Sequence, residues 1–143
     1  MGDRYVDELA DALSDESKRE RIRESVLVGR PHRPSAVALA GWDSYLIVVA
    51  NKNADLIGQI LSDVAEKQNR DPFDVAADLV IDEPDMYVAC GVMSEDDMKL
   101  AMEQDWLMFS SDGGAWPIVE ESDAPSISHP RSFGSQARVL SKY

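Results

Sequence analysis

An aspartate and an arginine near the end of the chain have side chains suited to acid–base and carboxylate chemistry. Asp112 opens an Asp-Gly-Gly run directly after the apolar segment 106–110, and a carboxylate is a group that general acid–base chemistry uses. Arg131 stands in a His-Pro-Arg run, and its guanidinium fork suits a two-point grip on a carboxylate. His129, two positions earlier, could assist at the edge of such a pocket.

Each of these three residues also has an ordinary structural interpretation. Asp-Gly is a common turn pair, so the residues alone favour a tight turn at Asp112. Arg131 could be a surface arginine that pairs with the acidic run at 120–123, and His129 could be an exposed loop residue. The acidic run has the spacing of no calcium loop, which favours a solvated loop there.

Residues that could bind a metal are sparse. The two histidines, His32 and His129, lie far apart in the sequence. His32 stands between a proline and an arginine, a setting typical of a solvated loop. Cys90 lies in an apolar run and is expected to be a small core residue. Catalytic zinc needs about three converging ligands, so we expect no zinc site within this chain.

The composition is that of one acidic globular domain. The chain has 143 residues, of which 44% are hydrophobic and 29% are charged. Its formal net charge of −13 opposes binding to nucleic acids and to anionic membranes. No apolar run is long enough to span a membrane, and the first residues do not resemble a signal peptide. With one cysteine, these features predict a cytoplasmic protein.

Capping residues and apolar spacing predict the helices. Residues 1–40 are expected to form a helical segment and a linker, with Ser14 or Asp15 capping a second helix. Apolar residues between 56 and 65 recur at helical spacing, which predicts a helix that ends near residue 69. Asp71 and Pro72 form a strong helix start, and Ser94 has the spacing of a capping box with Asp97.

Three apolar runs predict strands at residues 45–50, 86–93 and 106–110. The first is continuously apolar, which is typical of a strand covered on both faces in a parallel sheet. The strand–helix–strand order from 86 to 110 predicts a right-handed parallel crossover. The sequence therefore indicates an α/β fold with an α/β core at residues 41–143. Sheet edges left unpaired in this chain would favour self-association.

Three pieces of the chain, in this order, resemble the N-acyl-D-amino-acid deacylases. This is the D-aminoacylase and N-acyl-D-glutamate deacylase group of the amidohydrolase superfamily. The pieces are Asp-Pro-Phe-Asp-Val-Ala-Ala-Asp-Leu at 71–79 with its preceding helix; Met-Ser-Glu-Asp-Asp at 93–97 with Trp-Leu-Met-Phe-Ser-Ser-Asp-Gly at 106–113; and His-Pro-Arg-Ser-Phe-Gly at 129–134 with Ala-Arg-Val-Leu-Ser-Lys-Tyr at 137–143. The resemblance extends from about residue 41 onward.

The resemblance implies part of a (β/α)₈ barrel with a helical insertion, comprising about three strands and four to five helices. Insertion helices would lie at 55–83, the last barrel strands at 86–112, and the active-site loop and C-terminal segment at 113–143. The family hydrolyses the amide bond of N-acyl-D-amino acids with a zinc-activated water. The family's metal-binding half is not found in this sequence, so we expect a truncated domain, inactive alone, whose partner is the remainder of the barrel.

By the same resemblance, Asp112 is the general base and then the general acid, at the mouth of the last barrel strand. Arg131 would anchor the substrate's carboxylate, with His129 at the pocket edge. One departure concerns Val48 and Val49, which stand where family members often carry a hydroxyl residue near that carboxylate. Two alternatives stay open: a non-catalytic α/β interaction module, and an inactive family member.

Overall fold

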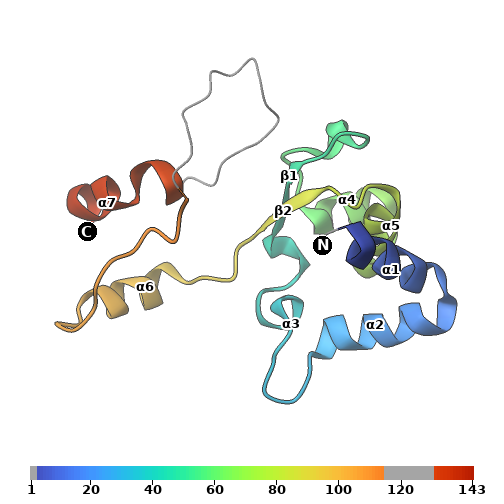
Figure 1. The fold of residues 1–143 in the computed structure, drawn as a ribbon, viewed down its shortest axis with the longest axis horizontal. Helices are drawn as coiled ribbons and strands as arrows, with labels where there is room; N and C mark the ends of the chain where they lie inside the picture. The colour runs from blue at the N-terminus through green and yellow to red at the C-terminus, as the bar shows by residue number, and fades with distance from the viewer. Residues whose placement is uncertain (1–2, 115–130) are drawn as a thin grey trace. The chain divides into compact units, whose positions relative to one another are not determined.

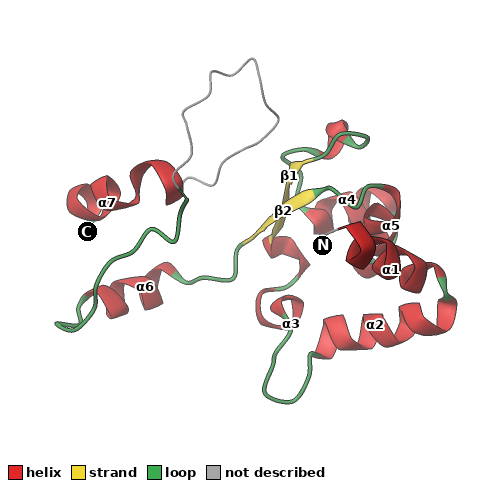
Figure 2. Ribbon diagram, viewed as in Figure 1, coloured by secondary structure: helices red, strands yellow, loops and turns green. Residues whose placement is uncertain are grey.

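The computed structural model describes residues 3–114 and 131–143, which form a mixed α/β fold (Figures 1 and 2). The chain divides into two compact units, Met1–Val92 and Met93–Tyr143. Within the described residues there are seven α-helices and two β-strands, against the four to five helices and about three strands predicted from the sequence. No helix in these ranges is both long enough and apolar enough to cross a membrane.

Local capping sets the helices that begin the first unit. Helix α1 covers Asp3–Ser14 and helix α2 covers Glu16–Val28. Asp15, between them, is the N-cap of α2, because its carboxylate accepts a hydrogen bond from the backbone N–H of Lys18 at 3.0 Å. Helix α2 ends at Gly29, whose φ of 82° lies in the region that favours glycine. A short helix, α3, follows at Ala36–Ala40.

The sheet of the first unit consists of two antiparallel strands, β1 (Tyr45–Val49) and β2 (Tyr87–Cys90). Short 3₁₀ turns lie on either side of β1, η1 at Trp42–Ser44 and η2 at Ala54–Leu56. Ile47 stands opposite Val88 in the strand register. Ile47 is fully buried, whereas all four residues of β2 are exposed. The sheet therefore contacts the core mainly through residues of β1.

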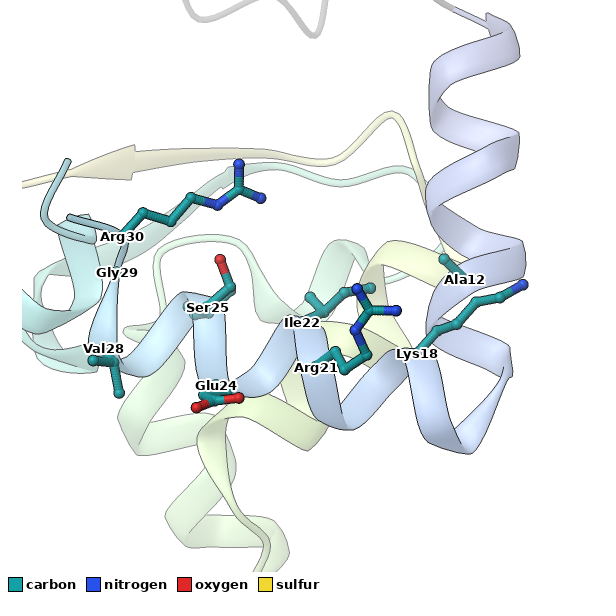
Figure 3. A pocket seen from close by; sticks show the side chains of 10 residues that line it. Ala12, Lys18, Arg21, Ile22, Glu24, Ser25, Val28, Gly29 and Arg30 are labelled. Atoms are coloured by element: carbon teal, nitrogen blue, oxygen red, sulfur yellow. The ribbon is translucent and has the colours of Figure 1, made fainter. Parts of the chain in front are cut away.

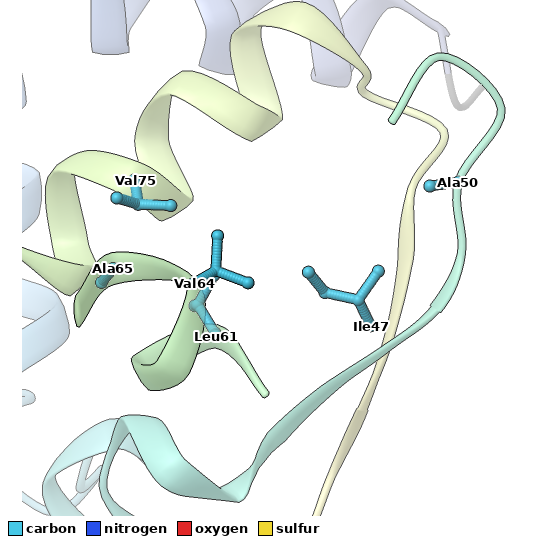
Figure 4. Packing of buried hydrophobic residues seen from close by; sticks show 6 residues of the cluster. All are labelled: Ile47, Ala50, Leu61, Val64, Ala65 and Val75. Atoms are coloured by element: carbon cyan, nitrogen blue, oxygen red, sulfur yellow. The ribbon is translucent and has the colours of Figure 1, made fainter. Parts of the chain in front are cut away.

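Helices α4 (Leu61–Gln68) and α5 (Pro72–Asp82) supply most of the core. In Figure 4, Ile47 points from β1 toward Val64 of α4, with Val75 of α5 nearby. These three side chains are the largest fully buried ones among the described residues. The predicted start of α5 is confirmed, since the carboxylate of Asp71 accepts a hydrogen bond from the N–H of Phe73 at 2.9 Å and Pro72 follows it.

Charged side chains attach α2 to α5. Arg19 lies 3.0 Å from carboxylate oxygens of both Asp74 and Asp78, and Arg23 lies 2.7 Å from Asp74. The guanidinium of Arg23 also lies 4.7 Å from the centre of the Phe73 ring. Phe73 is buried with Leu13 of α1 in a second apolar cluster, so α1, α2 and α5 meet there. Burial raises the pKa of Asp74, but hydrogen bonds from Arg19 and Arg23 outweigh it and lower that pKa.

The second unit contains helix α6 (Glu95–Met102) and helix α7 (Arg131–Lys142). The predicted cap at Ser94 is confirmed, since its hydroxyl accepts a hydrogen bond from the N–H of Asp97 at 3.3 Å. Lys142 and the Tyr143 hydroxyl bind Glu95 at 2.8 and 2.9 Å, and these bonds lower the pKa of Glu95 to about 2. Neither helix contains a buried residue.

Two predictions about the strands are wrong. Residues 106–110 form no strand, so there is no parallel crossover between 86 and 110, and the one sheet of the described residues is antiparallel. The run at 45–50 is a strand, but it is not covered equally on both faces, since Leu46 is 38% exposed. A continuous apolar run reports that a segment can be buried, whereas strand direction depends on which distant segment pairs with it.

The predicted helix across residues 56–65 is interrupted. Gly58 has a φ of 83°, and its N–H donates to the carbonyl of Ile47 at 2.8 Å. The N–H of Ile47 in turn donates to the carbonyl of Gln59 at 3.0 Å. Backbone bonds to β1 therefore hold residues 58 and 59 away from helical geometry, and α4 begins at Leu61.

Candidate functional site

Asp112 and Arg131 are in contact in the second unit, although residues 113–130 separate them in the sequence. Nη1 of Arg131 donates a hydrogen bond to a carboxylate oxygen of Asp112 at 2.5 Å. Arg131 is the first residue of α7, so the start of this helix positions its side chain. The structure thus brings together the two residues that the sequence singled out for proton transfer and carboxylate binding.

The backbone around Asp112 is an irregular loop held by serine hydroxyls. Asp112 has a φ of 51°, a left-handed conformation that aspartate tolerates better than most residues. The N–H of Asp112 donates to the hydroxyl of Ser110 at 3.3 Å, and the N–H of Gly113 donates to that of Ser111 at 3.2 Å. The contact with Arg131 is therefore present, whereas residues 111–114 form a loop without the tight turn that the Asp-Gly pair favours.

Gly113 lies close to the start of α7. A Cβ atom at position 113 would lie 3.0 Å from the Cα of Ser132 and 3.2 Å from the carbonyl oxygen of Arg131. Such contacts are tighter than side chains normally make, so a larger residue would require the loop and the helix to shift by a few tenths of an ångström. The absence of a side chain at Gly113 thus favours the close approach of this loop to α7.

The ion pair is open to solvent. The side chain of Asp112 is 88% exposed and that of Arg131 is 39% exposed. Exposed ion pairs contribute about 0–1 kcal/mol to stability, so another carboxylate could replace Asp112 on the guanidinium at little cost. The replaced Asp112 would then be a nearby carboxylate able to accept a proton. This exchange is the chemistry that the geometry of the pair permits.

His129 and the acidic run at 120–123 lie outside the described residues. His32 is exposed in a loop and has a φ of 63°. Within residues 3–114 and 131–143, no group of three or more histidine, cysteine, aspartate or glutamate side chains could hold a metal ion. The donor set that catalytic zinc requires is thus not found in this part of the chain.

The expectation that Cys90 is a core residue is wrong, since it is exposed on β2. Its sulfur lies 3.9 Å from the hydroxyl of Ser44. Burial, followed by a hydrogen bond with Cys90, raises the pKa of Tyr45 to about 12. The rings of Trp42 and Tyr45 pack together with their centres 5.8 Å apart, so these aromatics are packing residues. Val48 and Val49, in the same strand as Tyr45, are half-buried.

A cavity of about 560 Å³ in the first unit was not predicted (Figure 3). It runs along α2, where Lys18, Arg21 and Ile22 line it, and extends to Ala12 of α1 and to Arg30 after the helix. The signal in the sequence was the spacing of positions 18, 21, 22 and 25, which places them on one helical face. Because that face is mostly polar, the sequence alone indicates a solvated surface. The cavity forms only where α1 and the loop after α2 lie beside this face.

Neither a protein-family model, nor a curated protein, nor a solved structure matches this chain.

Proposed function

We propose that this chain carries the proton-transfer and substrate-anchoring residues of an amide hydrolase that acts on N-acyl-D-amino acids or related N-acyl compounds. The observation that supports this most is the 2.5 Å hydrogen bond between Arg131 and Asp112. Proton transfer in amide cleavage needs a carboxylate close to the substrate, and an acylated amino acid carries its own carboxylate as a handle. A paired aspartate and arginine can serve both needs.

In the proposed reaction, the carboxylate of an N-acyl-D-amino acid takes the place of Asp112 on the guanidinium of Arg131. Asp112 then accepts a proton from the attacking water, whose oxygen forms a bond to the acyl carbon. As the carbon–nitrogen bond breaks, Asp112 returns that proton to the leaving nitrogen. The products are a carboxylic acid and a D-amino acid. His129 is proposed to contact the substrate at the edge of the pocket.

The fold proposed for the complete enzyme is a (β/α)₈ barrel, with zinc as its metal. The described residues do not offer a zinc site, so the ligands are to be sought elsewhere in the complete protein. Barrel strands are parallel, whereas β1 and β2 pair antiparallel here. The proposal therefore requires β2, which is exposed on all four residues, to pair with other strands in the complete barrel.

The test uses the complete reading frame that contains this chain, with release of D-amino acids from N-acyl substrates as the measurement. Asp112→Asn keeps the size of the side chain but cannot accept the proton, so kcat should fall by about 10²-fold to 10⁴-fold. Arg131→Lys keeps the charge but loses the fork, so KM should rise more than kcat falls. Asp105→Asn, at an exposed aspartate of the same unit, is the matched control and should change neither.

Turnover near the wild-type rate in Asp112→Asn, with D-amino acids still released, would leave Asp112 with no role in proton transfer. No hydrolysis of any N-acyl-D-amino acid by the complete, metal-loaded protein would remove the proposed activity altogether.

A second candidate is a non-catalytic interaction module, and one observation favours it. The second unit leaves large apolar side chains exposed, among them Met93 at 89%, Met108 at 91% and Leu140 at 89%. Where such side chains form a contiguous patch, the patch is a candidate contact surface for another protein segment. Under this alternative the complete protein binds a partner through these residues and hydrolyses no N-acyl-D-amino acid.

A further inference from the structure

The two sides of helix α2 hold their cations in different ways. On one side, Arg19 and Arg23 make salt bridges to carboxylates of α5 at 2.7–3.0 Å. On the other side, Lys18 and Arg21 are one turn apart and line the cavity together with Arg30 (Figure 3). The cations that fasten α2 to the unit are thus distinct from those that face the cavity.

The cavity-facing cations make no salt bridge within the described residues. Lys18, Arg21 and Arg30 lack a carboxylate at salt-bridge distance there, although the chain carries 27 acidic residues against 14 basic ones. Asp15 attracts Lys18, but its carboxylate caps α2, and Glu24 also lines the cavity without forming an ion pair there. An acidic chain therefore has a locally positive groove, which attracts negative charge.

Apolar side chains also line the groove. Ile22 and Ala12 are half-buried members of its lining, and the cavity volume is about 560 Å³. Lys18 and Arg21 lie one turn apart on α2, whereas Arg30 lies beyond the C-terminal end of that helix. A single phosphate or carboxylate would be held by cations that converge on one point. Cations on the helix and on the loop after it, beside apolar side chains, instead match a ligand with several negative charges and an apolar stripe.

We propose that this groove along α2 binds an acidic, amphipathic peptide segment of a partner protein. The apolar stripe of the segment packs on Ile22 and Ala12, and its carboxylates pair with Lys18, Arg21 and Arg30. An amphipathic helix in a groove is a recurrent mode of peptide recognition. The choice of an acidic partner rests on charge complementarity, because the groove is positive in a chain that would repel most other acidic surfaces. This site is independent of Asp112 and Arg131.

The experiment measures fluorescence anisotropy of a labelled synthetic peptide with the full chain. The probe is a helix-forming peptide of about four turns, with leucines along one stripe and glutamates on both flanks. A sister peptide has lysine in place of every glutamate. The acidic peptide should bind, with an affinity that falls as salt is raised, and the lysine peptide should not. Charge reversal in Lys18→Glu/Arg21→Glu should weaken binding by about tenfold or more.

Lys67→Glu/Arg138→Glu is the matched control, because it changes the net charge by the same amount at positions outside the groove. It should change the affinity by less than about twofold at physiological salt. Circular dichroism checks that the α2 variant keeps its helix, and Arg30→Ala, outside the helix, gives a second variant that should also bind less tightly.

Three outcomes would overturn the proposal. The acidic peptide fails to bind, or binds no better than the lysine peptide. The control pair weakens binding as much as the groove variant does, which would mean that the groove has no local role. Inorganic phosphate alone displaces the peptide at low millimolar concentration, which would make the groove a simple anion site.

Discussion

Ile47→Ala should remove a large part of the stability of the first unit. Ile47 of β1 is fully buried in a cluster with residues of helices α4 and α5. The change removes three carbons, each worth about 0.8 kcal/mol when buried, and leaves a cavity that adds about 1 kcal/mol. The expected loss is therefore about 3–4 kcal/mol. A domain of about 90 residues has a free energy of unfolding of about 5–14 kcal/mol, so the loss is a large share of it.

The assay is urea unfolding followed by tryptophan fluorescence. Trp42 packs against the Ile47 cluster, so a background of Trp106→Phe/Trp116→Phe leaves a probe of the first unit alone. The matched control is Val88→Ala, because Val88 faces Ile47 across the sheet but is 45% exposed. This control should lose less than about 1 kcal/mol. If Ile47→Ala costs no more than the control, Ile47 is not at the centre of the core and the packing argument fails.

The remaining predictions concern charged groups of the first unit. A double-mutant cycle with Arg23→Met and Asp74→Asn should give a coupling of about 1 kcal/mol in urea unfolding, and a value near zero would mean that this salt bridge does not attach α2 to α5. Burial raises the pKa of Glu83, but hydrogen bonds led by those from Asn51 and Asn53 lower it to about 2 from the ordinary 4.5. Stability from Glu83 is thus present above pH 4.5 and is lost as pH falls toward 2. In Glu83→Gln, unfolding followed against pH should show less stability at neutral pH and a shallower loss over this window, and an unchanged pH profile would contradict the assignment.

The exposed ion pair of the second unit and the buried carboxylate of the first illustrate two uses of an acidic side chain. Glu83 is 4% exposed and binds backbone N–H groups of the turn after β1, which makes it a structural group. The carboxylate of Asp112 is exposed and accepts a hydrogen bond from the side chain of Arg131, a partner that it can exchange for another. This contrast in exposure fits the proposal that Asp112 transfers protons, which rests on its hydrogen bond with Arg131.

The sequence by itself determined features that depend on a few neighbouring residues. The caps at Asp71 and Ser94 were predictable, and that of α2 was narrowed to Ser14 or Asp15, because a side chain bonds a backbone N–H two or three positions away, with no need for the rest of the fold. The strand at 45–50 was predictable as a segment because its β-branched, apolar residues favour extended and buried backbone.

Only the tertiary structure decided which distant segments meet. The antiparallel pairing of β1 with β2 and the break at Gly58 depend on backbone bonds between residues far apart, which local patterns do not contain. The contact of Asp112 with Arg131 depends on the position of α7 beside the loop at residues 110–114. The groove along α2 likewise exists because Arg19 and Arg23 bind α5 and so turn the remaining cations outward. Each of these features depends on which distant segments pair. Composition and periodicity do not distinguish one pairing from another, so the sequence pattern alone could not predict them.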